Sequence, residues 1–138
     1  MKKLLLLSAI LIFACSSDDS SEDNSLPAYT IEGKWIWSPT ENISDANTMY
    51  IYEDGIRYTY YCTSEISNDC QSLFESFQAN DENHLPTTNP YTFQDNVLTV
   101  DLHFGNELLT PVTFECDGDE VYFETPEYSL FRLNSDCN

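Results

Sequence analysis

The feature that most constrains the fold of this chain is a series of short segments in which apolar and polar residues alternate. These segments are rich in Tyr, Phe, Val, Ile and Thr, and turn-forming residues interrupt them about every dozen positions. Side chains of a β-strand point alternately to its two faces, so this pattern predicts strands with one buried face. We expect an all-β domain with eight strands, at residues 29–38, 49–52, 56–62, 91–93, 97–104, 108–116, 121–125 and 128–133.

The connections between these strands predict their arrangement. Residues 53–55, 94–96 and 117–120 (EDG, QDN and DGDE) have the composition of tight hairpin turns. If consecutive strands run antiparallel, these turns meet at one end, and the longer segments 39–48 and 63–90 meet at the other. We therefore expect a single up-and-down eight-stranded barrel with a closed base and an open mouth. A sandwich of two sheets is the alternative.

The N-terminus indicates export. Residues 1–14 have a basic start, an apolar centre and a small last residue, Ala14, and are expected to be a signal peptide. The sequence LIFAC, which ends at Cys15, resembles a bacterial lipobox and implies that Cys15 is lipidated. Residues 15–27 are expected to be a flexible acidic tether, and residues 28–138 the folded domain. Residues 16–20 (SSDDS) resemble the export signal of surface lipoproteins of the Bacteroidetes type, which implies an outer-membrane protein exposed at the cell surface.

The charge balance limits the partners. All 24 acidic residues lie after residue 14, where the only bases are Lys34, Arg57 and Arg132. Such a surface repels nucleic acids and anionic lipid headgroups, so we expect membrane contact through the anchor on Cys15 alone. The acidic surface favours cations or a basic protein as partners, and the alternative is that it only keeps an exported protein soluble. We expect a monomer.

Three residues carry a resemblance to a known family. Gly33 and Trp35 form a Gly-x-Trp motif on the first predicted strand, and Arg132 lies on the last. With eight short strands and the lipobox, this pattern resembles the lipocalin-like lipoproteins over about residues 29–134. The resemblance implies that Trp35 closes the base of the barrel beneath Arg132, as a structural signature rather than a binding site. It also implies a ligand cavity at the mouth.

The four cysteines of the domain are suited to disulfides in an exported protein. Four cysteines allow three pairings. The strands that end near Cys116 and Cys137 neighbour the same strand, and Cys62 and Cys70 flank the start of the longest loop. We therefore expect the disulfides Cys62–Cys70 and Cys116–Cys137.

Catalytic and cofactor motifs are not recognisable in the chain, so we expect a protein that is not an enzyme and has no cofactor. Asp101 and His103 are two residues apart and could act as an acid and a base. We expect instead that they point outward, because Leu98, Val100, Leu102 and Phe104 then take the inner face. The cysteines and histidines lack the spacing of a zinc site, and residues 117–120 are too short for an EF-hand, so no metal is expected.

The aromatic residues point to binding. With Trp35 and Ile56 directed inward, Trp37, Tyr58 and Tyr60 point inward too. Residues 69–77 are expected to form a short helix whose apolar side chains either plug the mouth or cover a ligand. A non-catalytic binder of a small apolar or aromatic molecule follows, with a pocket of Trp37, Tyr60, Phe74, Phe77 and Tyr91.

Two alternatives remain if the barrel is filled by its own side chains. The first is a surface module that contacts glycans through exposed tyrosines. Its candidate residues are Tyr50, Tyr52, Tyr61 and Tyr122. The second is an inhibitor whose acidic face binds a basic partner protein.

Overall fold

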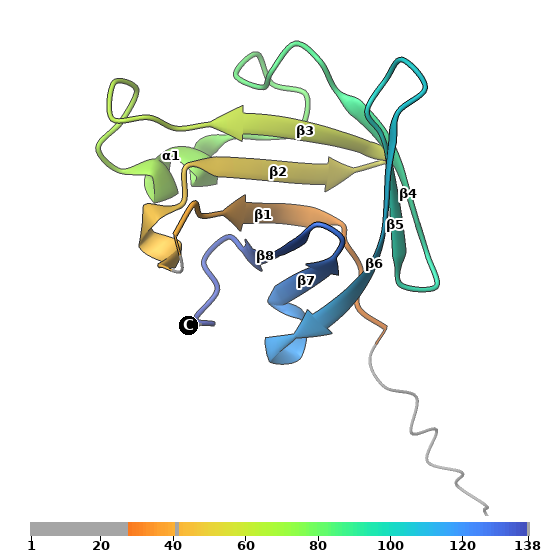
Figure 1. The fold of residues 1–138 in the computed structure, drawn as a ribbon. Coiled ribbons are helices and arrows are strands. Elements are labelled where there is room, and N and C mark those ends of the chain that lie inside the picture. The colour runs from red at the N-terminus through yellow and green to blue at the C-terminus, as the bar shows by residue number, and fades with distance from the viewer. Residues whose placement is uncertain (1–27, 41, 138) are drawn as a thin grey trace, which may run out of the picture.

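The computed structural model describes residues 28–40 and 42–137, and shows a closed antiparallel β-barrel (Figure 1). Its strands are β1 (Gly33–Trp37), β2 (Thr48–Glu53), β3 (Ile56–Tyr61), β4 (Asn89–Gln94), β5 (Val97–Asp101), β6 (Glu107–Glu115), β7 (Glu120–Glu124) and β8 (Glu127–Arg132). Each strand pairs with the next along the chain, and β8 pairs with β1. The predicted up-and-down topology is confirmed, and the sandwich is excluded.

The two ends of the barrel differ as the turn sequences indicated. Tight turns join β2 to β3 and β4 to β5, where Glu53 pairs with Ile56 and Gln94 pairs with Val97. A short 3-10 helix, η2 (Cys116–Gly118), joins β6 to β7 at the same end, which is the base. Residues 38–47 and 62–88 connect strands at the opposite end, the mouth. The described chain also enters at the base, where a Cβ on Gly118 would contact the Tyr29 ring.

Trp35 and Arg132 close the base. The Trp35 side chain is fully buried, and its indole Nε1–H donates to the carbonyl of Ile31 at 2.6 Å. The Arg132 Cζ lies 4.4 Å from the centroid of the Trp35 ring, which is the expected cation–π contact. Gly33 has a φ of 117°, which L side chains rarely adopt, and a Cβ there would lie 2.8 Å from Arg132 Nη1, so the position favours glycine.

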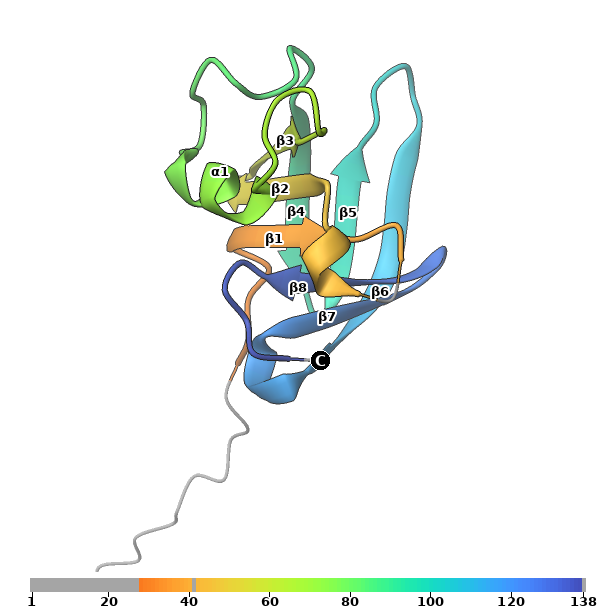
Figure 2. The same ribbon diagram turned by 90° about the vertical axis from the view of Figure 1, so that its left-hand side faces the viewer.

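Two separate hydrophobic clusters stabilise the fold. The first fills the barrel and includes Trp35, Leu98, Val121, Phe123 and Leu130. The second lies outside the barrel wall, between β1–β3 and the single α-helix of the described residues, α1 (Cys70–Ser76) (Figure 2). Each strand of this wall therefore has apolar residues on both faces.

The second cluster corrects the prediction for the helix. α1 neither plugs the mouth nor covers it, because Phe74 and Phe77 pack with Tyr60 against the outer face of the wall. Tyr58 also faces outward, since the register of β2 and β3 pairs it with Ile51, which belongs to the same outer cluster. The physical reason is that the more apolar face of β3 packs against α1 outside the barrel, whereas Arg57 and Thr59 face the interior, so alternation alone does not show which face is inside.

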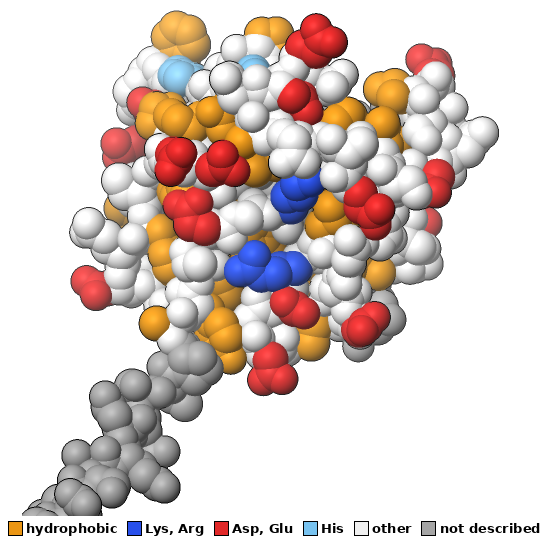
Figure 3. All heavy atoms as spheres, turned by 180° about the vertical axis from the view of Figure 1, so that it is seen from behind, with side chains coloured by type: hydrophobic (Ala, Val, Ile, Leu, Met, Phe, Trp, Pro, Cys, Tyr) orange, Lys and Arg blue, Asp and Glu red, His pale blue; other side chains and the backbone are white. Residues whose placement is uncertain are grey.

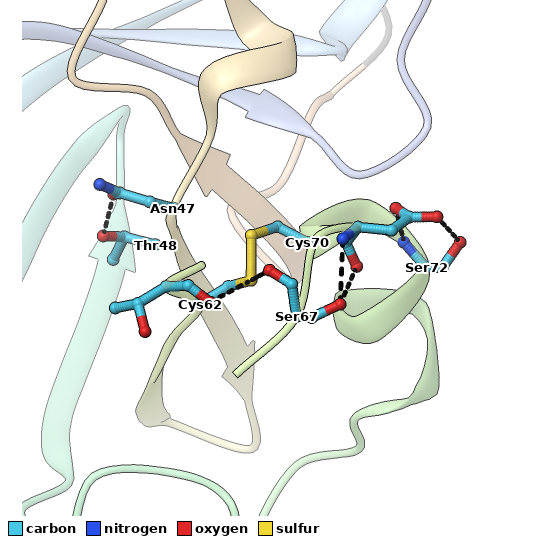
Figure 4. The surroundings of a disulfide bond; sticks show 8 residues. Asn47, Thr48, Cys62, Ser67, Cys70 and Ser72 are labelled. Carbon is cyan, nitrogen blue, oxygen red and sulfur yellow. Dashed lines mark hydrogen bonds between the residues drawn. A yellow bond between two sulfur atoms is a disulfide. The ribbon is translucent and has the colours of Figure 1, made fainter. Parts of the chain in front are cut away.

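Disulfides join both expected pairs of cysteines, Cys62–Cys70 and Cys116–Cys137. The first connects the residue after β3 to the start of α1 (Figure 4). Asp69 caps the helix, because its carboxylate accepts from the backbone N–H of Ser72 at 3.0 Å. This disulfide and cap hold a helix of only two turns against the barrel wall.

The end of β5 corrects a second prediction. Leu98 and Val100 are buried as expected, but the strand ends at Asp101, and the next residues form a turn. Leu102 is 42% exposed and Phe104 is fully exposed, so neither contributes to the barrel interior. Among the described residues, no helix is long and apolar enough to cross a membrane.

Candidate functional site

The best candidate site is a hollow at the mouth of the barrel, which we call the mouth recess. It has a volume of about 410 Å³. Inward-facing residues of four strands line it: Trp37, Thr48, Tyr50, Tyr61 and Tyr128. The strand register explains why they meet, because Thr48 pairs with Trp37 on one side and with Tyr61 on the other.

A second hollow adjoins the mouth recess. It has a volume of about 450 Å³ and includes the loop that follows β1. Its lining residues are Trp37, Ser38, Pro39, Thr40, Tyr128, Ser129 and Phe131. Trp37 and Tyr128 line both hollows, so a ligand in the mouth recess contacts two rings that also face this neighbouring space.

The aromatic walls of the recess are supported from within the barrel. The Tyr128 ring stacks on Phe123, with a centroid distance of 4.4 Å and an interplanar angle of 6°, and Phe123 is fully buried. Tyr50 is half-buried between the recess and Tyr52, which lies deeper. Rings held by buried neighbours lose little freedom when a ligand stacks on them, which favours binding.

A guanidinium lies beside this wall. The Cζ of Arg57 is 5.2 Å from the centroid of the Tyr50 ring. Arg57 Nη2 donates to the side-chain oxygen of Asn89 at 2.7 Å, and Arg57 Nε is buried without a hydrogen-bond partner. In the described part of the chain the only salt bridge joins Arg132 to Asp119, so Arg57 has no carboxylate partner there.

The tyrosines around the guanidinium remain protonated at neutral pH. Burial raises the pKa of Tyr52 to about 12, and the charge of Arg57 opposes part of that rise. Burial also raises the pKa of Tyr50 and of Tyr128. The inner wall therefore presents neutral phenols and one positive charge.

The predicted ligand-binding residues do not form one site. Trp37 lines the mouth recess, but Tyr60, Phe74 and Phe77 belong to the outer cluster beneath α1. Tyr91 faces the barrel interior at a different level, where its ring packs edge-to-face on Tyr52 and its hydroxyl donates to Glu32. The structure therefore does not bring the five predicted residues together, and of them Trp37 lines the mouth recess.

Sequence reasoning missed Tyr50, Tyr128 and Arg57, although a signal for two of them was present. The two-residue turn Asp54-Gly55 fixes the register of β2 and β3 and places Tyr50 opposite Thr59. Trp35 points inward and pairs with Tyr50, so Tyr52, two residues further along β2, points inward too. Arg57 pairs with Tyr52 and therefore lies on the same inner face. Tyr128 has no comparable signal, because its position depends on the pairing of β8 with both neighbours.

The tyrosines proposed for glycan contact do not form an exposed patch. Tyr52 is 1% exposed and Tyr50 is half-buried, so neither is available on the outer surface. Tyr61 is half exposed at the mouth, and Tyr122 is half-buried on β7. The prediction of a tyrosine surface is wrong for Tyr50 and Tyr52.

The other candidate groups have structural partners. An Asp101 carboxylate oxygen accepts from the backbone N–H of His103, and the His103 ring nitrogen Nε2 lies 2.7 Å from the carbonyl oxygen of Thr88. These bonds hold the turn after β5. Among residues 28–40 and 42–137, no three His, Cys, Asp or Glu side chains are placed to bind one metal ion.

Comparison with known proteins adds no relative. The chain matches no family model, and searches of curated proteins and of solved structures found no match.

Proposed function

We propose that the protein is a lipid-anchored, lipocalin-like barrel that binds a small aromatic molecule in the mouth recess. The observation that supports this most directly is the gathering of Trp37, Tyr50, Tyr61 and Tyr128 around one hollow at the open end. Its volume of about 410 Å³ lies in the range of small-molecule sites, roughly 300–1,000 Å³. Flat aromatic walls favour a flat ligand, because stacked rings bury the largest area.

The position of the recess is consistent with an anchor on Cys15. The described chain enters at the base of the barrel, beside Gly118, whereas the recess opens at the mouth. A lipid on Cys15 would attach the barrel through its base and leave the mouth unobstructed. Labelling of growing cells with a fatty acid tests the anchor: the label is expected on the wild-type chain and not on Cys15→Ser.

Binding can be tested with the neutral fluorophore N-phenyl-1-naphthylamine. We use the chain from residue 15 with Cys15→Ser, because an attached lipid would compete for the probe. We expect saturable binding that quenches tryptophan fluorescence. Tyr61→Ala should weaken binding about tenfold, since it removes one stacking wall from a half-exposed position.

Tyr122→Ala is the matched control. It removes the same side chain from β7, at a position that does not line the recess. The control should bind the probe like the parent chain. Absence of saturable binding, or equal losses in Tyr61→Ala and Tyr122→Ala, would contradict the proposed site.

A further inference from the structure

The starting observation is the position of Arg57 within the barrel. Of the three basic residues that the structure describes, Lys34 reaches α1 on the outer face, where its Nζ donates to the carbonyl of Glu75, and Arg132 closes the base. Arg57 is the one that faces the interior beside the mouth recess. Figure 3 shows how few basic side chains appear among the carboxylates on one face of the molecule.

The depth of Arg57 follows from the register of β2 and β3. Thr48 and Tyr61 pair at the rim, Tyr50 pairs with Thr59 one step deeper, and Tyr52 pairs with Arg57 one step deeper again. The guanidinium therefore lies below the Tyr50 ring, 5.2 Å from its centroid. A ligand that stacks in the recess would have this charge beneath it.

The guanidinium retains binding capacity. Its contacts are the side-chain oxygen of Asn89, the face of Tyr50 and the hydroxyl of Tyr52, none of which is charged at neutral pH, and its Nε–H is buried and unpartnered. A buried donor without a partner is costly, and groups of this kind are usually completed by a ligand, water or ion. An arginine fork suits a planar anion, because it can donate two parallel hydrogen bonds.

We propose that the ligand is an aromatic anion, a planar ring system with a carboxylate or a sulfonate, whose charge is balanced by Arg57. This inference rests on the proposed function and specifies its ligand. The aromatic part stacks against the tyrosines of the recess, and the acidic group points inward past Tyr50. Because the site is partly screened from water, the attraction exceeds that of an exposed pair.

Two probes with the same ring skeleton separate charge from shape. N-phenyl-1-naphthylamine is neutral, and 1-anilinonaphthalene-8-sulfonate adds one sulfonate. On the Cys15→Ser chain we expect the anionic probe to bind at least about tenfold more tightly than the neutral one, although the protein is strongly acidic. We also expect this preference to shrink as salt is added.

Arg57→Gln should abolish the preference, so that its affinities for the two probes lie within about twofold of each other. Lys34→Gln is the matched control, because it removes one positive charge from the outer face and should preserve the preference. Arg57→Lys retains the charge without the fork and should restore part of it. Near-ultraviolet circular dichroism checks that each variant keeps the native packing.

The outcomes distinguish this inference from the function on which it rests. If the neutral probe binds and the anionic probe binds no better in the wild-type background, the role of Arg57 is wrong while the binding site stands. The same holds if Arg57→Gln keeps the preference. If neither probe binds, the proposed function itself fails. If Arg57→Gln does not fold, the wild-type background still tests the inference, because added salt should reduce its preference for the anionic probe.

Discussion

The two faces of the wall formed by β1, β2 and β3 are both rich in aromatic residues, yet they end in different environments. On the outer face, Met49, Ile51 and Tyr60 are covered by α1 and have almost no contact with water. On the inner face, Tyr50 and Tyr61 remain partly accessible and surround the mouth recess. Aromatic content therefore does not show which face binds a ligand.

The polar groups of the two faces explain the difference. The outer cluster satisfies its fully buried phenol internally, because the Tyr60 hydroxyl donates to the carbonyl of Gln78 at 2.6 Å. The inner face contains Arg57, whose Nε is buried without a partner. A surface with an unsatisfied polar group beside partly exposed rings is suited to a ligand, whereas a dry apolar cluster stabilises the fold.

The largest loss of stability is expected from a substitution at the base of the barrel, where Trp35 points inward. Trp35→Ala should lower the free energy of unfolding by about 3–5 kcal/mol, because it removes a fully buried ring and leaves a cavity beneath Arg132. Chemical denaturation measures this change. An unfolding midpoint equal to that of the wild type would show that Trp35 does not hold the base together.

A smaller effect is expected on the outer face. Phe74→Ala should cost about 3 kcal/mol, since the side chain is 1% exposed and packs beneath a short helix that can partly collapse onto the gap. Probe affinity in the mouth recess should stay unchanged in folded protein. A loss of probe binding together with stability would mean that the two faces are not independent.

The fold was predictable from the sequence because the signals that specify it are local. The turns at residues 53–55, 94–96 and 117–120 defined the hairpins, and the strand ends placed Cys116 near Cys137. The disulfide pairs followed from that topology, and the contact of Arg132 with Trp35 was implied by the resemblance to lipocalin-like lipoproteins and agrees with it. Each depends on which strands are neighbours, not on which face points inward.

The candidate site was less predictable because it depends on the inward face of β3. Ile56, Tyr58 and Tyr60 form the more apolar set, so simple alternation directs them to the interior. The structure places Arg57 and Thr59 there instead, because α1 provides a second apolar surface for Tyr58 and Tyr60. A helix outside a barrel reverses the usual rule for one strand, and the sequence of that strand does not reveal it.

The smallest expected effect is the dependence of the free energy of unfolding on pH, which arises from the ionisation of one buried tyrosine on each face. Burial raises the pKa of Tyr52, on the inner face, and of Tyr60, on the outer face, to about 12 from an ordinary 10.0. As pH rises above 10, tyrosines of the unfolded chain lose their protons while these two stay protonated in the folded chain. The free energy of unfolding should therefore be undiminished below pH 10 and fall between pH 10 and about 12.

Replacing Tyr52 or Tyr60 by phenylalanine should make the fall in the free energy of unfolding above pH 10 shallower. A substitution at Arg57 distinguishes the two tyrosines. The charge of Arg57 lowers the pKa of Tyr52, so Arg57→Gln should raise the pKa of Tyr52 further and leave that of Tyr60 unchanged. Ultraviolet titration of Arg57→Gln, with and without Tyr52→Phe, isolates the affected group. A shift that persists after Tyr52→Phe would belong to Tyr50 or Tyr128, whose pKa values the charge of Arg57 also lowers. The absence of any shift in Arg57→Gln would place the charge of Arg57 elsewhere than on the inner face.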